Sequence, residues 1–585
     1  MMKKKRMIMS FLLIAAMAMG LAGCSGNPAA AGKTTVVLWG YADEMEAESI
    51  YNTVNWYNEN NTDGIYIDYY PQPGGTYVSL AERALASNKG PDVFYVGDRY
   101  LKRWAKYGYL ENIQSYVDEA GIDFSTMWQS AQYRYRYDPV NNTNNIDDPL
   151  YALPKDISSS ALYYNATVME DQGIKIISVD EEDLDAFNAG GEDRNGNTKA
   201  DLGIPADFTV PAKGFYREQP YTNGLFTAPT YGTDGKVIET MIFNNRIAMS
   251  WDEIEDLAMI LTKSYNPNLG AEDTTWGYYT EYWFNYGWGV GGDCAVDTTG
   301  NGDWEFTLGD KTQKRLVYNA DGSYVTDEFG KAVFVAEGEE YELADGQYLG
   351  ELLPSQYEAF ERFVLLGKPK EYGGLAIAPR QSQDIGLQSS TSFFSDGRVA
   401  MLVETSEKAI SFRNSITDFE WDVAPLPVYK EYAADGVTVV NRGIEVGHSG
   451  STGLAVWTKS NVKAEAFKVA QYFSTGYAQT LQAQTGYMIP NDMALAQTEY
   501  VQYNLDSGQA PKNISIFTRM AESSRPGDWW YMPDNLWIDN WATPLNTEYR
   551  ENAASLDDFF AAYTDSTNAI LRQYKEQGFV GGGDA

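Results

Sequence analysis

Residues 34–41 read TTVVLWGY and residues 90–96 read GPDVFYV, and the chain between them alternates two patterns. Apolar residues recur with helical spacing at 50–57 and again at 77–85. Residues 65–69 alternate apolar with more polar side chains, as strands do. The order strand, helix, strand, helix, strand at this spacing predicts an α/β domain with a parallel sheet.

The residues at the ends of two of these strands are candidates for ligand contact. In open parallel sheets, ligands bind beyond the carboxyl ends of the strands. Trp39 and Tyr41 close the first strand, and Asp98 and Arg99 follow the third. We expect the first pair to line one wall of a site. The second pair would offer a carboxylate acceptor and a forked donor, although Asp98 could equally be a helix N-cap.

The first 23 residues have the pattern of an export signal, with basic residues at 3–6 and an apolar run at 8–21. The run is shorter than the roughly 20 residues that span a bilayer. It closes on Leu-Ala-Gly-Cys, which is similar to the lipobox of bacterial lipoprotein precursors. That resemblance implies removal of residues 1–23 and a lipid on Cys24, with residues 24–33 as a flexible leash. The alternative is an ordinary secretory signal.

The composition disfavours some classes of function. The chain has 81 acidic and 44 basic residues and a net charge of −37, which argues against a nucleic-acid partner. Aromatic residues make up 14%, with 43 Tyr and 15 Trp. Such rings suit sugar faces, which stack on them while the hydroxyl groups form hydrogen bonds; the alternative is that they fill a large core. If Cys24 carries lipid, Cys294 has no partner for a disulfide.

Signatures of enzymes are scarce. No phosphate-binding glycine loop occurs. The single histidine, His448, cannot build a multi-histidine zinc site, and we expect it to be a loop residue. A glycoside hydrolase that uses two carboxylates stays open as an alternative, because 81 acidic residues do not exclude one by count, although nothing in the sequence marks a pair. We therefore expect no enzyme and no required cofactor.

Helix starts are marked by pairs that fit the capping box, Ser250 with Glu253 and Ser355 with Glu358. In the same way, Ser555 with Asp558 predicts a helix near the end of the chain. Several stretches then resemble, in order, extracellular solute-binding proteins of bacterial ABC importers, in the sugar-binding branch that includes maltose-binding protein. These stretches are VVLWGY at 36–41, GPDVFYVGDRYLKRWAKYGYLENI at 90–113, YALPKDISSSALYYN at 151–165, SWDEIEDLAMIL at 250–261, SDGRVAMLVE at 395–404, WDVAPLP at 421–427 and GLAVWTKSNVKAEAFKVAQYF at 453–473.

The resemblance implies a two-lobed, periplasmic-binding-protein-like (type II) α/β fold with the ligand cleft between the lobes. By that resemblance, lobe one is 34–156 plus 422–462 and lobe two is 157–421 plus 463–585, with crossings near 155–157 and 421–423. Two regions depart from a compact family member, and we expect both to be inserts in lobe two. Residues 174–246 are rich in Gly, Asp and Asn and loop-like, whereas residues 296–350 contain alternating stretches that predict antiparallel strands.

The function that the resemblance implies is capture of an oligosaccharide for delivery to an ABC permease. The protein would be a monomer on the outer face of the bacterial cell membrane, held there by the lipid on Cys24. A binding protein for a peptide or another solute is the alternative. Beyond Trp39, Tyr41, Asp98 and Arg99, the residues that we expect to contact ligand are Asp156, Trp283, Tyr286, Trp288, Asp293, Glu404, Trp530, Trp537 and Trp541. For the rings the alternative is a place in the core, and for Glu404 it is a solvated strand end.

One loop is similar to an EF-hand or dockerin calcium loop. Asp193, Asn195, Asn197 and Asp201 place oxygen side chains at loop positions 1, 3, 5 and 9, and Lys199 would give its backbone carbonyl. The twelfth position, however, is an isoleucine where an acid is expected. The sequence therefore predicts either a structural calcium ion or a polar turn. A weaker echo is formed by Asp297, Asn301 and Asp303.

Overall fold

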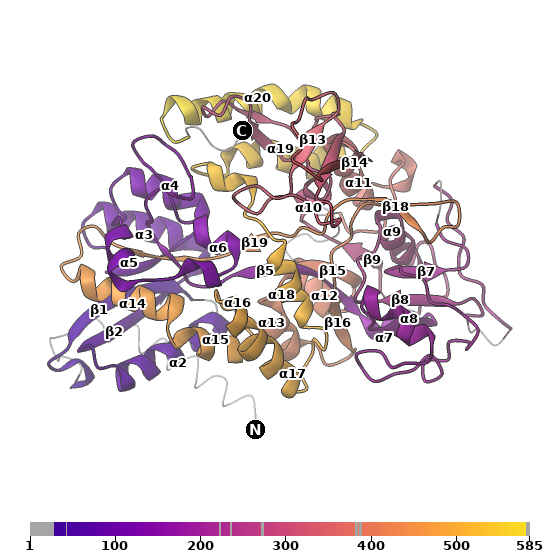
Figure 1. Ribbon diagram of the computed structural model, residues 1–585, viewed down its shortest axis with the longest axis horizontal. Coiled ribbons are helices and arrows are strands. Elements are labelled where there is room, and N and C mark those ends of the chain that lie inside the picture. The colour runs from indigo at the N-terminus through magenta and orange to yellow at the C-terminus, as the bar shows by residue number, and fades with distance from the viewer. Residues whose placement is uncertain are drawn as a thin grey trace.

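The computed structural model describes residues 28–580 apart from 43, 222–223, 234–236, 271–273, 381–383 and 385–388. The signal segment 1–23, Cys24 and the start of the leash lie outside the described residues. None of the described helices is both long and apolar enough to cross a membrane. Figure 1 shows a molecule with one lobe on the left, a larger one on the right, and α19 and α20 across the top.

Lobe one is built on a five-stranded sheet in the order β2-β1-β3-β20-β4. β1 (Thr34–Tyr41) runs parallel to β2 (Ile65–Gln72) and β3 (Val93–Val96), which confirms the parallel sheet predicted from the alternating pattern. β20 (Gly453–Val456) runs antiparallel to β3 and to β4 (Leu153–Pro154). The helices of this lobe are α2 (Glu44–Asn60), α3 (Tyr77–Ala86), α4 (Asp98–Lys106), α5 (Gln114–Ala120), α14 (Lys463–Thr475) and α15 (Ala478–Gln484).

Lobe two contains a sheet in the order β16-β5-β15-β9. β5 (Ser158–Asn165) is antiparallel to β16 (Trp421–Ala424) and β15 (Val399–Thr405), which is parallel to β9 (Trp276–Tyr279). All three predicted capping boxes are confirmed, at α9, α11 and α20. The main helices here are α7 (Ala166–Asp171), α9 (Trp251–Ile260), α10 (Trp283–Trp288), α11 (Gln356–Gly367), α12 (Ser390–Ser395), α13 (Lys408–Ser415), α16 (Met493–Leu495), α17 (Tyr503–Asp506), α18 (Ser515–Glu522), α19 (Leu536–Pro544) and α20 (Leu556–Glu576).

The chain crosses between the two sheets at 155–157, where the resemblance placed a crossing, but the return crossing differs from expectation. β16 pairs with β5, so residues 421–424 belong to lobe two. The return lies between β19 (Ser449–Gly450), which pairs with β5, and β20. The expected limits 422–462 for lobe one are therefore wrong, because the sheet that a strand joins depends on distant partners.

Helix α14 gives a second correction to the expected limits. The resemblance places this helix in lobe two with residues 463–585, yet its apolar face packs in the core of lobe one. Ala466, Val469 and Phe473 all lie in the cluster that contains β1 and β3 residues such as Leu38 and Phe94. The apolar face of the helix was predicted correctly, whereas the lobe against which it packs was not.

The first insert, 174–246, is more ordered than the loop-like segment that its composition predicts. It holds the sheet β6-β8-β7, formed by β6 (Ile174–Ile177), β8 (Met241–Asn244) and β7 (Phe215–Arg217). Around it lies a small core of its own, which includes Leu184 and Phe187 of α8 (Leu184–Asn188). A few apolar residues spread among many Gly and Asp residues are thus enough to form a packed unit.

The second insert confirms the predicted antiparallel decoration. β12 (Lys314–Tyr318) pairs antiparallel with β13 (Phe334–Ala336) and β14 (Tyr348–Leu353), and β10 (Ala295–Asp297) with β11 (Trp304–Phe306). Residues 340–343, which form one of the alternating stretches in this insert, are not a strand. At the far end of β12 and β13, a turn at 327–331 reaches α6 (Gln129–Tyr133), which precedes the lobe-one strand β4.

The lobes also meet along the segment 525–531, which includes the short helix η8 (Asp528–Tyr531). The Lys102 ammonium of α4 donates to the Tyr531 carbonyl oxygen at 2.8 Å, and the Trp530 indole nitrogen donates to the Arg134 carbonyl oxygen at 2.8 Å. Because both donors are buried, these bonds are protected from water. At this segment a side chain of each lobe therefore reaches the backbone of the other lobe.

Candidate functional site

Asp98 and Arg99 lie where lobe one faces segment 525–531. Gly97, not Asp98, is the N-cap of α4, and Asp98 lies in the first turn, where its carboxylate accepts the Arg99 backbone N–H at 2.9 Å. The Arg99 guanidinium lies 5.8 Å from the centroid of the Trp529 ring of lobe two. Among the described residues Arg99 forms no ion pair. Its donors are therefore available to a ligand at a point that both lobes reach.

His448 lies beside the same tryptophan. Its ring is 5.3 Å from Trp529 and 5.7 Å from Phe284. Burial, followed by the positive charges of Arg134 and Arg99, lowers the pKa of His448 to about 3, so the imidazole is neutral at ordinary pH. Within the described part of the chain, its Nε2 atom is buried without a hydrogen-bond partner. The residue expected to be an ordinary loop histidine is therefore part of the boundary between the lobes.

Glu404 continues this row at the end of β15. Tyr282, whose ring is 6.4 Å from that of His448, donates its hydroxyl to Glu404 Oε1 at 3.0 Å. The Ser390 hydroxyl lies 3.4 Å from Glu404 Oε2. Burial raises the pKa of Glu404, which argues against the solvated strand end that was the alternative. We call the continuous set Asp98, Arg99, Trp529, His448, Tyr282 and Glu404 the seam row.

Tyr41 lies close to the seam row but is packed within lobe one. Its ring meets those of Tyr77 and Tyr95 edge to face, at 4.8 and 5.3 Å. Burial raises its pKa, and the nearby carboxylates of Glu46, Asp156 and Asp98 raise it further. Trp39 is half-buried against the same core. Of these two predicted residues, Tyr41 is therefore close to the charged groups of the seam, whereas Trp39 is placed only against the core.

Asp156 is buried at the first crossing and already has a partner. It forms an ion pair with Lys155, whose ammonium is also 3.2 Å from Glu46. Burial alone would lower the pKa of Lys155, but Asp156 and Glu46 outweigh it and raise that pKa. The Asp156 carboxylate therefore holds the crossing together, and its contact with a ligand stays a prediction.

Most of the lobe-two rings that were expected to stack on ligand belong to the core. Trp537 and Trp541 are fully buried, and Trp530 and Tyr286 are 2% and 5% exposed. Their faces are covered by protein in this structure, as is most of the Trp529 ring, which is 6% exposed. Ligand contact by these four rings stays a prediction. Trp283 is the exception: it is half-buried, meets Trp541 edge to face at 4.9 Å and is 6.4 Å from Trp529. It borders the seam row.

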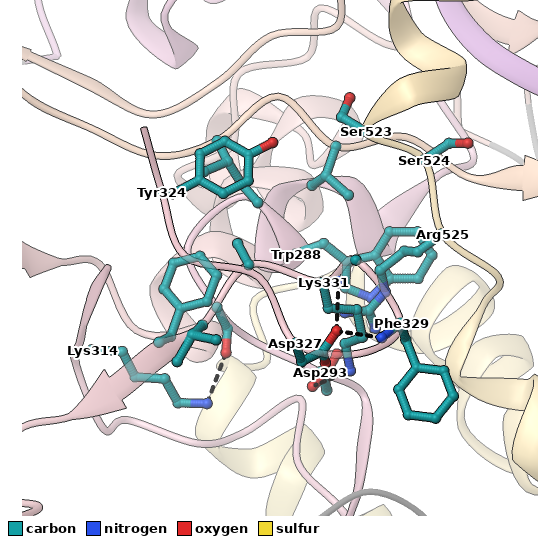
Figure 2. Close-up of a pocket in the computed structure, with 17 residues that line it drawn as sticks. Trp288, Asp293, Lys314, Tyr324, Asp327, Phe329, Lys331, Ser523, Ser524 and Arg525 are labelled. Atoms are coloured by element: carbon teal, nitrogen blue, oxygen red, sulfur yellow. Dashed lines mark hydrogen bonds and ion pairs between the residues drawn. The ribbon is translucent and has the colours of Figure 1, made fainter. Parts of the chain in front are cut away.

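Trp288 and Asp293 line a separate pocket, and the Trp288 ring lies 6.3 Å from that of Trp529. Arg525 stacks over the Trp288 ring at 4.3 Å and forms an ion pair with Asp293. Figure 2 shows Trp288, Asp293 and Arg525 beside Asp327, Phe329 and Lys331 of the second insert. Trp288 and Asp293 thus line one pocket together, and neither belongs to the seam row.

The loop that resembles a calcium site closes on its own backbone. Asp193 Oδ1 accepts the N–H groups of Asn195 and Asn197, both at 2.9 Å. Asp201 Oδ2 accepts from the N–H and hydroxyl of Thr198, and the Lys199 ammonium donates to two backbone carbonyl oxygens. Among the described residues, no group of three or more His, Cys, Asp or Glu side chains could hold a metal ion. The calcium prediction stays untested.

The weaker echo at 297–303 has the same character. Asp297 accepts the backbone N–H groups of Thr299, Gly302 and Asp303, and the Asp303 carboxylate pairs with Lys575 of α20. Asp297 is only 2% exposed. The short acidic side chains are therefore used to shape a hairpin turn.

Sequence reasoning missed Trp529, Tyr282 and His448. The first two lie in aromatic clusters that the composition brings out, but the rings chosen from those clusters were mostly their neighbours, and Trp529 is itself only 6% exposed. No local signal distinguishes Trp529 from Trp530. What separates them is that Trp529 faces Arg99, which is more than 400 positions away in the chain.

Comparison with known proteins supports the resemblance over part of the chain. The model of the family described as bacterial extracellular solute-binding protein matches residues 38–207. No curated protein matches by sequence. Among solved structures, the ABC substrate-binding protein Lmo0181 from Listeria monocytogenes in complex with cycloalternan is 14% identical, with a TM-score of 0.58, over 94% of this chain and 100% of that one.

Two further solved structures show the same fold at similarly low sequence identity. The cyclic α-maltosyl-1,6-maltose binding protein from Arthrobacter globiformis is 13% identical, covers 93% of this chain and 100% of that one, and gives a TM-score of 0.55. UgpB from Mycobacterium tuberculosis in complex with glycerophosphocholine is also 13% identical, covers 94% and 98%, and gives 0.55. Residues 38–207 thus match the bacterial extracellular solute-binding family by sequence, and the described chain has the two-lobed α/β fold of these solved binding proteins.

Proposed function

We propose that this protein is the lipid-anchored solute-binding component of an ABC importer for an oligosaccharide. The observation that carries the proposal is the seam row. It joins the donors of Arg99 in lobe one to the ring of Trp529 and the carboxylate of Glu404 in lobe two. A sugar offers an apolar face and many hydroxyl groups, and rings, guanidinium and carboxylate groups recognise both features. The neighbours that bind cycloalternan and cyclic maltosyl-maltose support this class of ligand.

Binding at a place that both lobes reach couples ligand to lobe closure. A ligand that contacts both lobes favours the closed arrangement, because only there are all its contacts made. The closed form would then dock on a membrane permease. Nothing in this scheme requires a bond to be broken, so we propose a receptor and not an enzyme.

Calorimetry of the purified protein tests the proposal. The titrants are cycloalternan and maltotriose, with glycerophosphocholine and a short peptide for the alternative solutes and product analysis for hydrolysis. We expect heat with at least one saccharide and no shortened products. Heat with the peptide or glycerophosphocholine alone would select another solute class, and released shorter sugars would select the hydrolase.

A matched pair of tryptophan variants locates the site. Trp529→Ala removes the ring beside Arg99, and we expect the affinity to fall at least about tenfold, which is about 1.4 kcal/mol. Trp56→Ala is the control, because Trp56 lies on α2 of lobe one and packs against Tyr472 and Tyr477 instead of the seam row. Equal affinities for both variants would place the ligand elsewhere.

The anchor is tested separately. Cys24→Ala should release the protein from the membrane fraction and leave its saccharide affinity unchanged, because the lipid would attach through residues 24–33 and not through either lobe. Retention of the variant in washed membranes would rule out the lipid on Cys24.

A further inference from the structure

A cavity of about 270 Å³ lies between the second insert and the body of lobe two. Its walls are the end of α10 with the segment after it, the strands and turn of 314–334, and residues 444–446 and 523–525 (Figure 2). The volume is just below the roughly 300–1,000 Å³ of common ligand pockets, so it suits a small group or one end of a longer ligand. The seam row contributes none of the residues that line it.

The polar side of the cavity is a carboxylate held beside an ammonium group. Asp293 forms an ion pair with Arg525, which also pairs with Asp528 and stacks on Trp288. Despite burial, the charges of Arg525 and Lys331 hold the pKa of Asp293 below its usual range. Asp293 is therefore an ionised acceptor that does not rotate freely, because Arg525 is fixed on both sides.

Lys331 is held much less tightly. Its ammonium lies 3.8 Å from Asp293, which is beyond hydrogen-bond distance, and its side chain is 26% exposed. The donors of this group are therefore not used by Asp293. A fixed acceptor and a loosely held donor a few ångströms apart match two neighbouring hydroxyl groups, one of which donates while the other accepts.

The apolar side of the cavity comes from the insert itself. Tyr324, which is 37% exposed, and Phe334 line it together with short aliphatic residues. The Phe334 ring packs over Gly291, where a Cβ atom would come within 2.4 Å of it. The ring is thus fixed by close packing, and the insert presents a rigid apolar wall opposite the charged pair.

We propose that this cavity binds one ring of a neutral saccharide, with two adjacent hydroxyl groups between Asp293 and Lys331 and the C–H face against Tyr324 and Phe334. The inference rests on the proposed function, since it takes the ligand class from there. Trp529 lies between the two places: its ring is 6.3 Å from that of Trp288 and 5.8 Å from the Arg99 guanidinium. The second insert then adds a saccharide subsite next to the seam row.

Calorimetry with maltotriose and cycloalternan on three lysine variants tests the subsite. Lys331→Met removes the donor, and we expect the affinity for the bound saccharide to fall about tenfold, whereas Lys331→Arg keeps a donor and should retain most of it. Lys468→Met is the matched control. Lys468 forms a similarly loose ion pair, 3.7 Å from Asp63, on the lobe-one helix α14.

Tyr324→Ala tests the apolar wall independently. We expect the affinity of this variant for the saccharide to fall as well. Thermal melts of every variant show whether the fold is kept. If the native protein, Lys331→Met and Tyr324→Ala all bind a saccharide with the same affinity, the subsite is overturned and the proposed function stays intact. Native protein that binds no saccharide would overturn both.

Discussion

The turns at 193–197 and 327–331, one in each insert, have the same hydrogen bonds and opposite surroundings. In each, the first residue is an aspartate whose Oδ1 accepts the N–H groups two and four positions later. In each, the fourth residue is a glycine with positive φ, Gly196 at 81° and Gly330 at 75°. The third residue differs: Asn195 is exposed to solvent, whereas Phe329 is only 4% exposed.

The difference shows that local chemistry decides the shape of a turn and distant neighbours decide its use. Phe329 meets Tyr133 of α6 edge to face at 4.9 Å and lies 6.4 Å from Trp530. Beside it, the Gln129 side-chain amide donates to the Glu328 carbonyl oxygen at 3.0 Å. The second insert is thereby fastened to the segment that leads into lobe one, while the tip of the first insert faces water.

The largest effect is expected when the buried ring is removed. Phe329→Ala takes away the contacts with Tyr133 and Trp530 and leaves a space that the rigid turn cannot fill. We expect a loss of about 3 kcal/mol in the free energy of unfolding, as for other buried Phe→Ala changes. Urea denaturation measures it, with Asn195→Ala as the matched control in the other turn.

Asn195→Ala should change the free energy by less than about 0.5 kcal/mol, because that side chain is exposed. Similar losses for the two variants would mean that Phe329 is not fastened to α6 in solution. The comparison would then reduce to two solvent-facing turns.

Alanine substitutions at the glycines of the two turns should differ by a smaller amount in the free energy of unfolding. At positive φ an alanine costs about 1 kcal/mol in either turn. At Gly196 a Cβ would meet no described atom within 4 Å, whereas at Gly330 it would lie 2.7 Å from Gln129 Oε1. Moving Gln129 aside gives up its hydrogen bond to Glu328, so Gly330→Ala should cost about 1 kcal/mol more than Gly196→Ala.

Thermal melts of the two variants side by side measure that difference. A larger loss at Gly196 than at Gly330 would contradict the close contact with Gln129. Equal losses would show that Gln129 moves away at no cost, and that its bond to Glu328 adds nothing to stability.

The sequence predicts features that depend on nearby residues and misses those that depend on distant ones. The strand and helix pattern of 34–96 and the capping boxes were predictable, because each depends on residues a few positions apart. The return crossing and the partner of α14 were not, because they depend on which distant sheet a strand or helix joins. Of the site, Asp98, Arg99 and Glu404 could be predicted from strand ends, whereas Trp529 and His448 owe their place to contacts between the lobes.

Added calcium is expected to leave the thermal stability of the protein unchanged, which is the smallest effect in this series. A calcium ion needs six to eight oxygen ligands, yet in the turn at 193–197 Asp193 Oδ1 already accepts two N–H groups and its Oδ2 accepts the Ser178 N–H at 3.1 Å. To bind the ion, Asp193 would have to give up bonds that hold the turn. Thermal melts with added calcium and with a chelator should therefore have the same midpoint. A midpoint that rises with calcium, and no longer does so in Asp201→Asn, would establish the metal site and make the two turns different in chemistry as well as in surroundings. Asp201 is the better residue to change, because its carboxylate touches only the exposed end of the loop at Thr198, so the variant should keep the turn that Asp193 closes.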